Sequence, residues 1–95
     1  MAVSLPARQP AWFVYLVRCQ DDTLYCGIAK DLARRLEEHN STDKGAKYTR
    51  GRRPVDMVYT EEVTSRAKAT QREGQIKKMS RAQKMALIQD GTPQQ

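Results

Sequence analysis

Two polar residues in segment 24–40 of this 95-residue chain have types and a spacing that suit chemistry on an anionic substrate. Arg35 can bind an anionic oxygen, and His39 can move a proton. If the segment is helical, residues four apart lie one turn apart on the same side. With Leu32 marking the buried direction, Arg35 and His39 fall on the shoulder of the apolar stripe. Arg34 falls on the far side and faces water.

Each of these two residues also fits a structural role. Arg35 could shield the helix edge while its stem packs on the core, and His39 could favour the negative end of the helix dipole. Their spacing at i and i+4 makes a shared functional role an equal alternative, and the residues alone leave both readings open.

Glu73 is a further candidate because it is the one acid in the basic segment 66–84. Helical geometry places it roughly 40–60° away from the inward face that Ala69 and Ile76 define. A helical glutamate is usually solvated and paired with a neighbour such as Lys77. A lone carboxylate among bases also suits one divalent cation, because Mg²⁺ needs only one or two carboxylates when phosphate and water complete its shell.

Tyr15 and Tyr25 lie in two neighbouring segments that have strand character. Either residue could be an ordinary core tyrosine. Both hydroxyls can reach one cleft only if the side chains share a face of the hairpin, which requires an odd number of loop residues or a bulge. A two-residue turn at Asp21 and Asp22 would put them on opposite faces.

The charge distribution indicates a nucleic-acid partner. Hydrophobic residues make up 39% of the chain, so it can build one modest core, and its net charge is +6. Segment 44–53 holds five bases and no acid, and segment 66–84 holds seven bases and one acid. Clustered bases repel one another unless a polyanion neutralises them, so we expect contact with nucleic acid. A solvated basic face is the plain alternative.

Cysteine usage and hydropathy indicate a cytosolic protein. Cys19 and Cys26 have no partners at zinc-binding spacing, so we expect free thiols in a reducing compartment. No apolar run reaches membrane-spanning length, and the first ten residues lack the apolar core of a signal peptide. We therefore expect a cytoplasmic or nucleoid-associated location and no membrane partner.

Segment boundaries predict one α+β domain over residues 12–89, between a flexible arm (1–11) and a flexible tail (90–95). The apolar runs WFVYLVRC and LYCGIA predict a hairpin, and Asp31 can cap a helix that follows. A basic loop leads to a third strand from Val55. Thr64 or Ser65, and then Ser80, can cap two more helices. The order β-β-α-β-α-α predicts a small three-stranded antiparallel sheet flanked by three helices.

These residues together resemble the GIY-YIG nuclease domain, above all its small stand-alone bacterial members of the YhbQ type. The resemblance covers residues 12–88 and rests on the combined pattern WFVYLVRC, LYCGIAKDLARRLEEHN, GAKYTRGRRP and REGQIKKMSRAQKMALI. Residue by residue, it implies catalytic roles for Tyr15, Tyr25, Arg35 and His39, a structural motif glycine at Gly27 and a metal-binding role for Glu73. Charge and resemblance together assign nucleic-acid contact to Lys44, Lys47, Tyr48, Arg50, Arg52 and Arg53.

The resemblance implies a DNA endonuclease that hydrolyses phosphodiester bonds with a single Mg²⁺ or Mn²⁺. In it, Tyr15 would activate a water, with His39 or Tyr25 adjusting its proton. Arg35 would bind the phosphate oxygens, and the five side chains Tyr15, Tyr25, Arg35, His39 and Glu73 would open into one cleft. The expected partner is DNA, in a DNA-repair context and a larger DNA-processing complex, with the chain itself a monomer or weak dimer.

The sequence departs from the family pattern at three places. Phe13 and Val14 replace the first motif's Gly-Ile, and Cys26 is the middle residue of the second motif. Met85 stands where some family nucleases have an amide, with Gln83 and Gln89 nearby. A non-catalytic nucleic-acid-binding module on the same scaffold is therefore the alternative. A protein-interaction domain whose basic face binds an acidic partner is the third.

Overall fold

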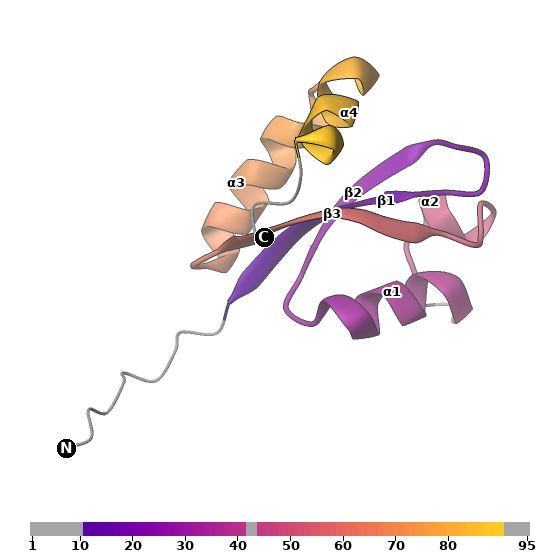
Figure 1. The fold of residues 1–95 in the computed structure, drawn as a ribbon. Helices are drawn as coiled ribbons and strands as arrows, with labels where there is room; N and C mark the ends of the chain where they lie inside the picture. The colour runs from indigo at the N-terminus through magenta and orange to yellow at the C-terminus, as the bar shows by residue number, and fades with distance from the viewer. Residues whose placement is uncertain (1–10, 42–43, 91–95) are drawn as a thin grey trace.

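The computed structural model describes residues 11–41 and 44–90 of the chain. Three strands, β1 (Trp12–Arg18), β2 (Leu24–Ala29) and β3 (Asp56–Val63), form one antiparallel sheet in the order β2-β1-β3. The central strand β1 is buried along its middle because both neighbours and both layers of helices cover it (Figure 1). This arrangement leaves β2 as an edge strand beside the candidate site.

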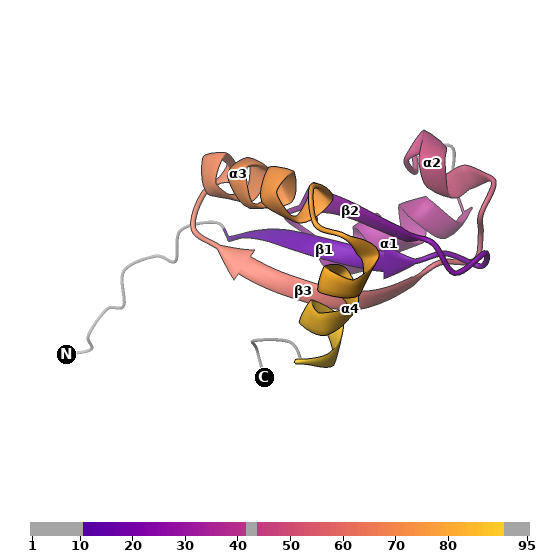
Figure 2. The same cartoon turned by 90° about the horizontal axis from the view of Figure 1, so that it is seen from above.

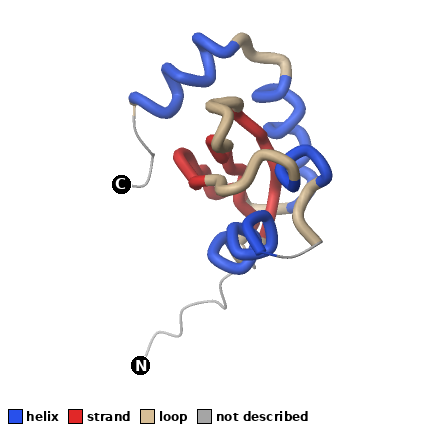
Figure 3. The backbone as a smooth tube through the Cα atoms, turned by 90° about the vertical axis from the view of Figure 1, so that its right-hand side faces the viewer, coloured by secondary structure: helices blue, strands red, loops and turns tan. Residues whose placement is uncertain are grey.

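Helices cover both faces of the sheet. One face carries α1 (Leu32–Ser41), and the other carries α3 (Arg66–Lys77) and α4 (Arg81–Gln89), as Figures 1 and 2 show. Viewed from the side in Figure 3, the strands lie between these helical layers. Alternate residues of β1 therefore enter two separate cores. Val14 and Leu16 pack with Ala69 and Ile76 of α3, whereas Tyr15 and Val17 pack with Leu32 and Leu36 of α1.

The predicted α+β architecture and the order of its elements are confirmed, with one additional helix. This helix, α2 (Lys47–Arg50), lies in the segment that the sequence predicts as a basic loop. It is a single four-residue turn, too short to show the apolar periodicity by which longer helices are predicted. The predicted caps are present: Asp31 accepts from the backbone N–H of Arg34 at 3.0 Å, and Ser65 and Ser80 cap α3 and α4.

The hairpin register decides which side chains can meet. Tyr15 pairs with Gly27, and Val17 pairs with Tyr25, so both tyrosines project toward α1. The loop between Arg18 and Leu24 has five residues, an odd number, as a shared face requires. Asp22 within this loop has a φ of 68°, a left-handed conformation that aspartate tolerates in turns.

Two further expectations concern the ends of the chain and membrane-spanning helices. The predicted arm and tail lie outside the described residues except for Ala11 and Asp90. None of the helices in the described part of the chain is long and apolar enough to cross a membrane.

Candidate active site

Tyr15 reaches the edge of the sheet because its cross-strand partner is a glycine. A Cβ atom on Gly27 would lie 2.6 Å from Cζ of Tyr15 and would also overlap the phenol oxygen. Any side chain at position 27 would therefore displace the tyrosine ring. The ring lies over the backbone of β2 and is almost fully buried, with 1% of its surface exposed. This packing explains why the second motif needs a glycine at this place.

The Tyr15 hydroxyl contacts two side chains from α1. Nε2 of His39 lies 2.7 Å from it, and Nε of Arg35 donates to it at 3.4 Å. The helix brings both partners to the same side because they are one turn apart. The sequence places Arg35 and His39 on the shoulder of α1, and their contacts with Tyr15 agree with that position. Arg34 projects to solvent with 71% of its side chain exposed.

Thr49 of α2 is a member of this cluster that sequence reasoning missed. Its hydroxyl lies 2.9 Å from Nδ1 of His39 and donates to the carbonyl of Ala46 at 2.9 Å. Thr49 and His39 are both fully buried. A threonine ten residues from a histidine has no recognisable spacing, so only the tertiary fold could reveal the contact.

The short contacts form one continuous hydrogen-bonded chain. In that chain the Tyr15 hydroxyl donates to Nε2 of His39, and Nδ1–H donates to Thr49. Thr49 then donates to the Ala46 carbonyl. The opposite tautomer has Nδ1 accepting from the Ala46 backbone N–H at 3.4 Å, a longer contact than the other three. The geometry therefore favours a proton on Nδ1, which leaves Nε2 free to accept the tyrosine proton.

Burial keeps both members of the Tyr15–His39 pair uncharged at neutral pH. Desolvation raises the pKa of Tyr15 to about 12, although the hydrogen bond and charge of Arg35 oppose this rise. Desolvation, together with the nearby charge of Arg35, lowers the pKa of His39 to about 4. The pair is therefore a neutral phenol donating to a neutral imidazole.

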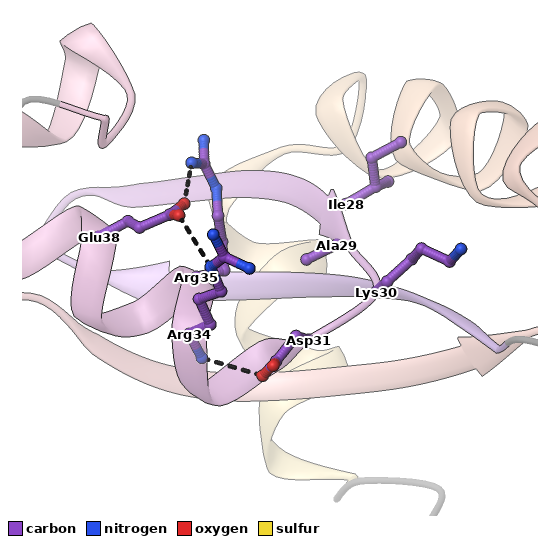
Figure 4. Close-up of a pocket in the computed structure, with 7 residues that line it drawn as sticks. All are labelled: Ile28, Ala29, Lys30, Asp31, Arg34, Arg35 and Glu38. Carbon is purple, nitrogen blue, oxygen red and sulfur yellow. Dashed lines mark hydrogen bonds and ion pairs between the residues drawn. The ribbon is translucent and has the colours of Figure 1, made fainter.

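Arg35 connects this buried pair with an open hollow. Its guanidinium donates from one terminal nitrogen to Glu38 at 2.8 Å and to the Lys44 carbonyl at 3.0 Å. The hollow measures about 340 Å³, and Figure 4 shows Arg34 and Arg35 both reaching the Glu38 carboxylate there. Its lining residues are Ile28, Ala29, Lys30, Asp31, Arg34, Arg35 and Glu38. Three bases against two acids line the hollow, and the guanidinium groups among these bases can bind a phosphate group.

Tyr25 joins the cluster through its ring. The ring centroid lies 5.6 Å from that of His39, edge to face, and 5.6 Å from that of Tyr48, with which it is stacked. Four of the five expected side chains, Tyr15, Tyr25, Arg35 and His39, are thus joined by contacts through Tyr15 and His39 on the α1 side of the sheet.

Glu73 does not join these four residues. It lies on α3, across the sheet from α1, and its carboxylate pairs with Lys77 at 3.4 Å. Its negative charge adds to desolvation in raising the pKa of Cys26 to about 12, so Glu73 lies near the residue that precedes Gly27 on β2. Glu73 therefore approaches β2 from the other face of the sheet, and one cleft shared by all five side chains stays a prediction.

The described residues contain no group of three or more histidine, cysteine, aspartate or glutamate side chains that could hold a metal ion. A cation at Glu73 would therefore have one protein carboxylate, which suits Mg²⁺ only when substrate oxygens and water complete the shell.

The predicted nucleic-acid contacts fall into two groups. Lys44, Lys47, Tyr48 and Arg50 are exposed, and Arg52 is half-buried. Arg53 instead turns inward and donates to the backbone carbonyls of His39 and Glu38 at the C-terminal end of α1. Its guanidinium satisfies carbonyls that the helix leaves unpaired. Arg53 therefore stabilises the end of α1 that carries His39, and its guanidinium does not extend the exposed basic surface.

Known proteins share this fold and sequence. A family model described as the GIY-YIG catalytic domain matches residues 11–86. A UPF0213 protein of Desulfotalea psychrophila is 54% identical over 84% of this chain and 73% of its own length. A UPF0213 protein of Halobacterium salinarum is 53% identical over 79% of this chain and 96% of its own.

Solved structures agree with this assignment. The solution structure of an E. faecalis protein is 40% identical, covers 84% of each chain and superposes with a TM-score of 0.58. That of the UPF0213 protein of Bacillus halodurans is 38% identical over 83% of each chain, with a TM-score of 0.53. The motif resemblance is thereby confirmed, and this chain belongs to the GIY-YIG nuclease superfamily, among the small proteins named UPF0213.

Proposed function

We propose that the protein is a DNA endonuclease that hydrolyses phosphodiester bonds with one divalent metal ion and selects its substrate by structure or by weak sequence preference. The observation that supports this most is the buried Tyr15–His39 pair, held by Arg35 at the margin of a basic hollow. A buried proton-transfer pair beside an anion-binding arginine can supply the proton transfer and the charge stabilisation that speed phosphoester hydrolysis.

Tyr15 acts as a proton relay in this proposal. A free phenolate is disfavoured because the pKa of Tyr15 is about 12. The hydroxyl instead passes its proton to Nε2 of His39 while it accepts a proton from the attacking water. The water oxygen bonds to phosphorus as the bond from phosphorus to the leaving oxygen breaks, and the leaving oxygen takes a proton from solvent. Tyr15 is then a neutral phenol again, and His39, whose charged form is disfavoured by burial, releases its extra proton to solvent when the product leaves. Neither Tyr15 nor His39 needs to be charged before the reaction begins.

Arg35 binds the non-bridging phosphate oxygens as negative charge develops on them. In the free protein its guanidinium pairs with Glu38, which a phosphate would replace. Because Arg35 also contacts the Tyr15 hydroxyl, its movement onto the phosphate uncovers that hydroxyl to the attacking water.

Glu73 fits the role of a single-carboxylate metal ligand for a phosphodiester that lies across the edge strand β2, because Glu73 approaches this strand from the face opposite Arg35. Its carboxylate is partly exposed and its pairing with Lys77 is a surface ion pair that is weak in water. Bound Mg²⁺ or Mn²⁺ would supply a Lewis acid that stabilises the leaving oxygen. The exposed bases Lys44, Lys47 and Arg50 contact the DNA backbone, and such contacts position the substrate without reading its sequence.

The test is a nicking assay on duplex, flapped, branched and single-stranded DNA with and without Mg²⁺ or Mn²⁺. Arg35→Ala should lower the cleavage rate by about 100-fold or more, because a transition-state contact is lost. Arg66→Ala is the matched control: it removes the same charge from an exposed arginine at the start of α3, outside the proposed site, and should change the rate by less than about threefold. Equal losses in both variants would contradict the proposed role of Arg35.

Glu73 is tested in the same assay. Glu73→Gln should abolish metal-dependent cleavage while DNA binding persists, and Glu37→Gln, an exposed acid on α1, should not. Cleavage by Glu73→Gln at the wild-type rate would show that the metal ligand lies elsewhere.

A non-catalytic nucleic-acid-binding module is the second candidate, and two observations favour it. Met85 occupies the position of the downstream amide, and the neighbouring Gln83 amide is engaged in capping α4 through the backbone N–H of Ser80 at 2.9 Å. DNA binding without cleavage of any of these substrates, with either metal, would support this module and exclude the nuclease. Absence of DNA binding even at low salt would instead favour an acidic protein partner.

A further inference from the structure

A stack of planar groups leads from the buried pair to the surface. His39 contacts the Tyr25 ring, Tyr25 stacks on the Tyr48 ring with an interplanar angle of 24°, and the Arg52 guanidinium lies 4.0 Å from the Tyr48 centroid. Tyr48 is the one large hydrophobic side chain in the described segments that is classed as exposed, at 37%. The stack therefore ends at the surface on a guanidinium plane.

The Arg52 guanidinium is held in a fixed orientation. Its Nε donates to Asp21 at 2.9 Å, and one terminal nitrogen donates to the Tyr48 carbonyl at 2.8 Å. Hydrogen bonds of guanidinium lie in its plane, so they leave its flat faces available. One face lies on Tyr48, and 38% of the Arg52 side chain is exposed to solvent. The outer face of the guanidinium can therefore accept a ligand without a loss of side-chain conformational entropy, because the two hydrogen bonds already fix the side chain.

We propose that the outer face of Arg52, supported by Tyr48, stacks an unpaired nucleobase of a DNA strand whose backbone runs into the Arg35 hollow. Guanidinium and aromatic planes are established platforms for bases in single strands. Exposed Lys47 and Arg50 on the same helix turn as Tyr48 supply the positive charge that a backbone needs. A base within a duplex has both faces covered by its neighbours, so only a single-stranded, flapped or splayed nucleotide can stack here.

This inference takes DNA as the partner from the proposed function and narrows the substrate to strands with an unpaired base next to the cleavage site. It is separable from catalysis, because stacking needs neither the metal nor Tyr15.

The experiment measures binding without metal, in EDTA, by fluorescence anisotropy with two labelled single strands of equal length. One is oligothymidylate, and the other has abasic sites in place of the bases, so both carry the same phosphates. The wild-type protein should bind the base-containing strand about five- to tenfold more tightly, which corresponds to the lower range for stacking of one base.

Arg52→Lys keeps the positive charge but removes the planar guanidinium group. The preference of this variant for the base-containing strand should therefore fall to about twofold or less. Arg66→Lys, a matched exchange on an exposed arginine at the start of α3, outside both the stack and the proposed path of the backbone, should keep the wild-type preference. Tyr48→Leu should also lose the preference, and Tyr48→Phe should retain it, because only the ring supports the guanidinium. Thermal melting identifies any variant whose loss reflects unfolding.

Two results would overturn the inference. Equal binding of both strands by the wild-type protein would show that the phosphates alone account for the affinity. The nicking assay would still test DNA cleavage independently. An unchanged preference in folded Arg52→Lys and Tyr48→Leu would place the base elsewhere. Absence of binding to either strand would overturn this inference, and the nicking assay on duplex, flapped and branched DNA would then decide the proposed function separately.

Discussion

His39 is held in the interior as a neutral imidazole, and this has a consequence for stability as well as for proton transfer. The residue is fully buried, its ring bridges Tyr15 and Thr49, and its pKa is lowered to about 4 by desolvation and the charge of Arg35. In the unfolded chain its pKa is near 6.5. Between these two values, the unfolded state binds more protons than the folded state.

The free energy of unfolding should therefore fall as the pH decreases from about 6.5 to about 4. The loss from this one residue should reach about 3 kcal/mol at the lower limit and be absent above pH 7. Urea unfolding across this range measures it. His39→Gln, which removes the only histidine of the chain, should lose this pH dependence even if its stability is lower throughout. A wild-type curve that is flat from pH 7 to 4 would show that the imidazole is not held neutral.

Thr49 determines which nitrogen of His39 carries the proton. The hydrogen-bonded chain requires Nδ1–H to donate to the Thr49 hydroxyl, so ¹⁵N NMR of the single histidine should show the Nδ1–H tautomer. Thr49→Val removes the acceptor while keeping the shape, and should shift the population toward Nε2–H and lower cleavage by about tenfold or more. Thr49→Ser should restore both properties. An Nε2–H tautomer in the wild-type protein would exclude the relay through His39.

At the scale of elements, the sequence predicts most of the framework and part of the site. The strands and three helices follow from apolar runs and from caps at Asp31, Ser65 and Ser80, which are local signals. The side of α1 that carries Arg35 and His39 follows from helical periodicity. Both kinds of inference succeed because they depend on neighbours within a few residues.

The missed features depend on contacts between distant segments. Helical angles show that Glu73 lies beside the inward face of α3, but not which face of the sheet α3 covers, so its position across the sheet from α1 was not predictable. Thr49 and the inward turn of Arg53 depend on how segment 44–53 packs against the end of α1. Gly45 permits that packing, because a Cβ there would lie 2.7 Å from the Glu38 carbonyl oxygen.

The two glycines Gly74 and Gly45 should respond in opposite ways to alanine. Gly74 lies within α3 and is exposed, and an added Cβ would meet no heavy atom within 4 Å. Gly74→Ala should therefore stabilise the protein by about 0.5–1 kcal/mol through helix propensity. Gly45→Ala should destabilise it, because the added Cβ would push the segment away from α1. Urea unfolding of both variants compares them, and a stabilised Gly45→Ala would contradict the packing described here.

At the scale of the whole molecule, the placement of charge matters more than its sum. Arg66 and Lys68 begin α3 at the end of the sheet where Trp12 starts β1, and the Arg66 guanidinium lies 5.7 Å from the Trp12 ring centroid. Lys47 and Arg50 lie on α2 at the opposite end of the sheet, beside the loop between β1 and β2 (Figure 2). In this loop the backbone N–H of Gln20 donates to the carbonyl of Arg52. Each pair contributes two positive charges, but only the second lies next to the candidate site.

Salt dependence of DNA binding distinguishes these two pairs. If the backbone of a single strand lies along α2, Lys47→Ala/Arg50→Ala should reduce the slope of log K against log salt concentration by about 1.4, because two phosphate contacts and their counterion release are lost. Arg66→Ala/Lys68→Ala lowers the net charge equally and should change the slope by less than about 0.5, since distant charges are screened at ordinary salt. Because the two variants have the same net charge, a difference in slope can come only from position. Equal slopes would mean that the protein attracts DNA through its total charge, and the strand would then have no fixed path past Arg52 into the Arg35 hollow.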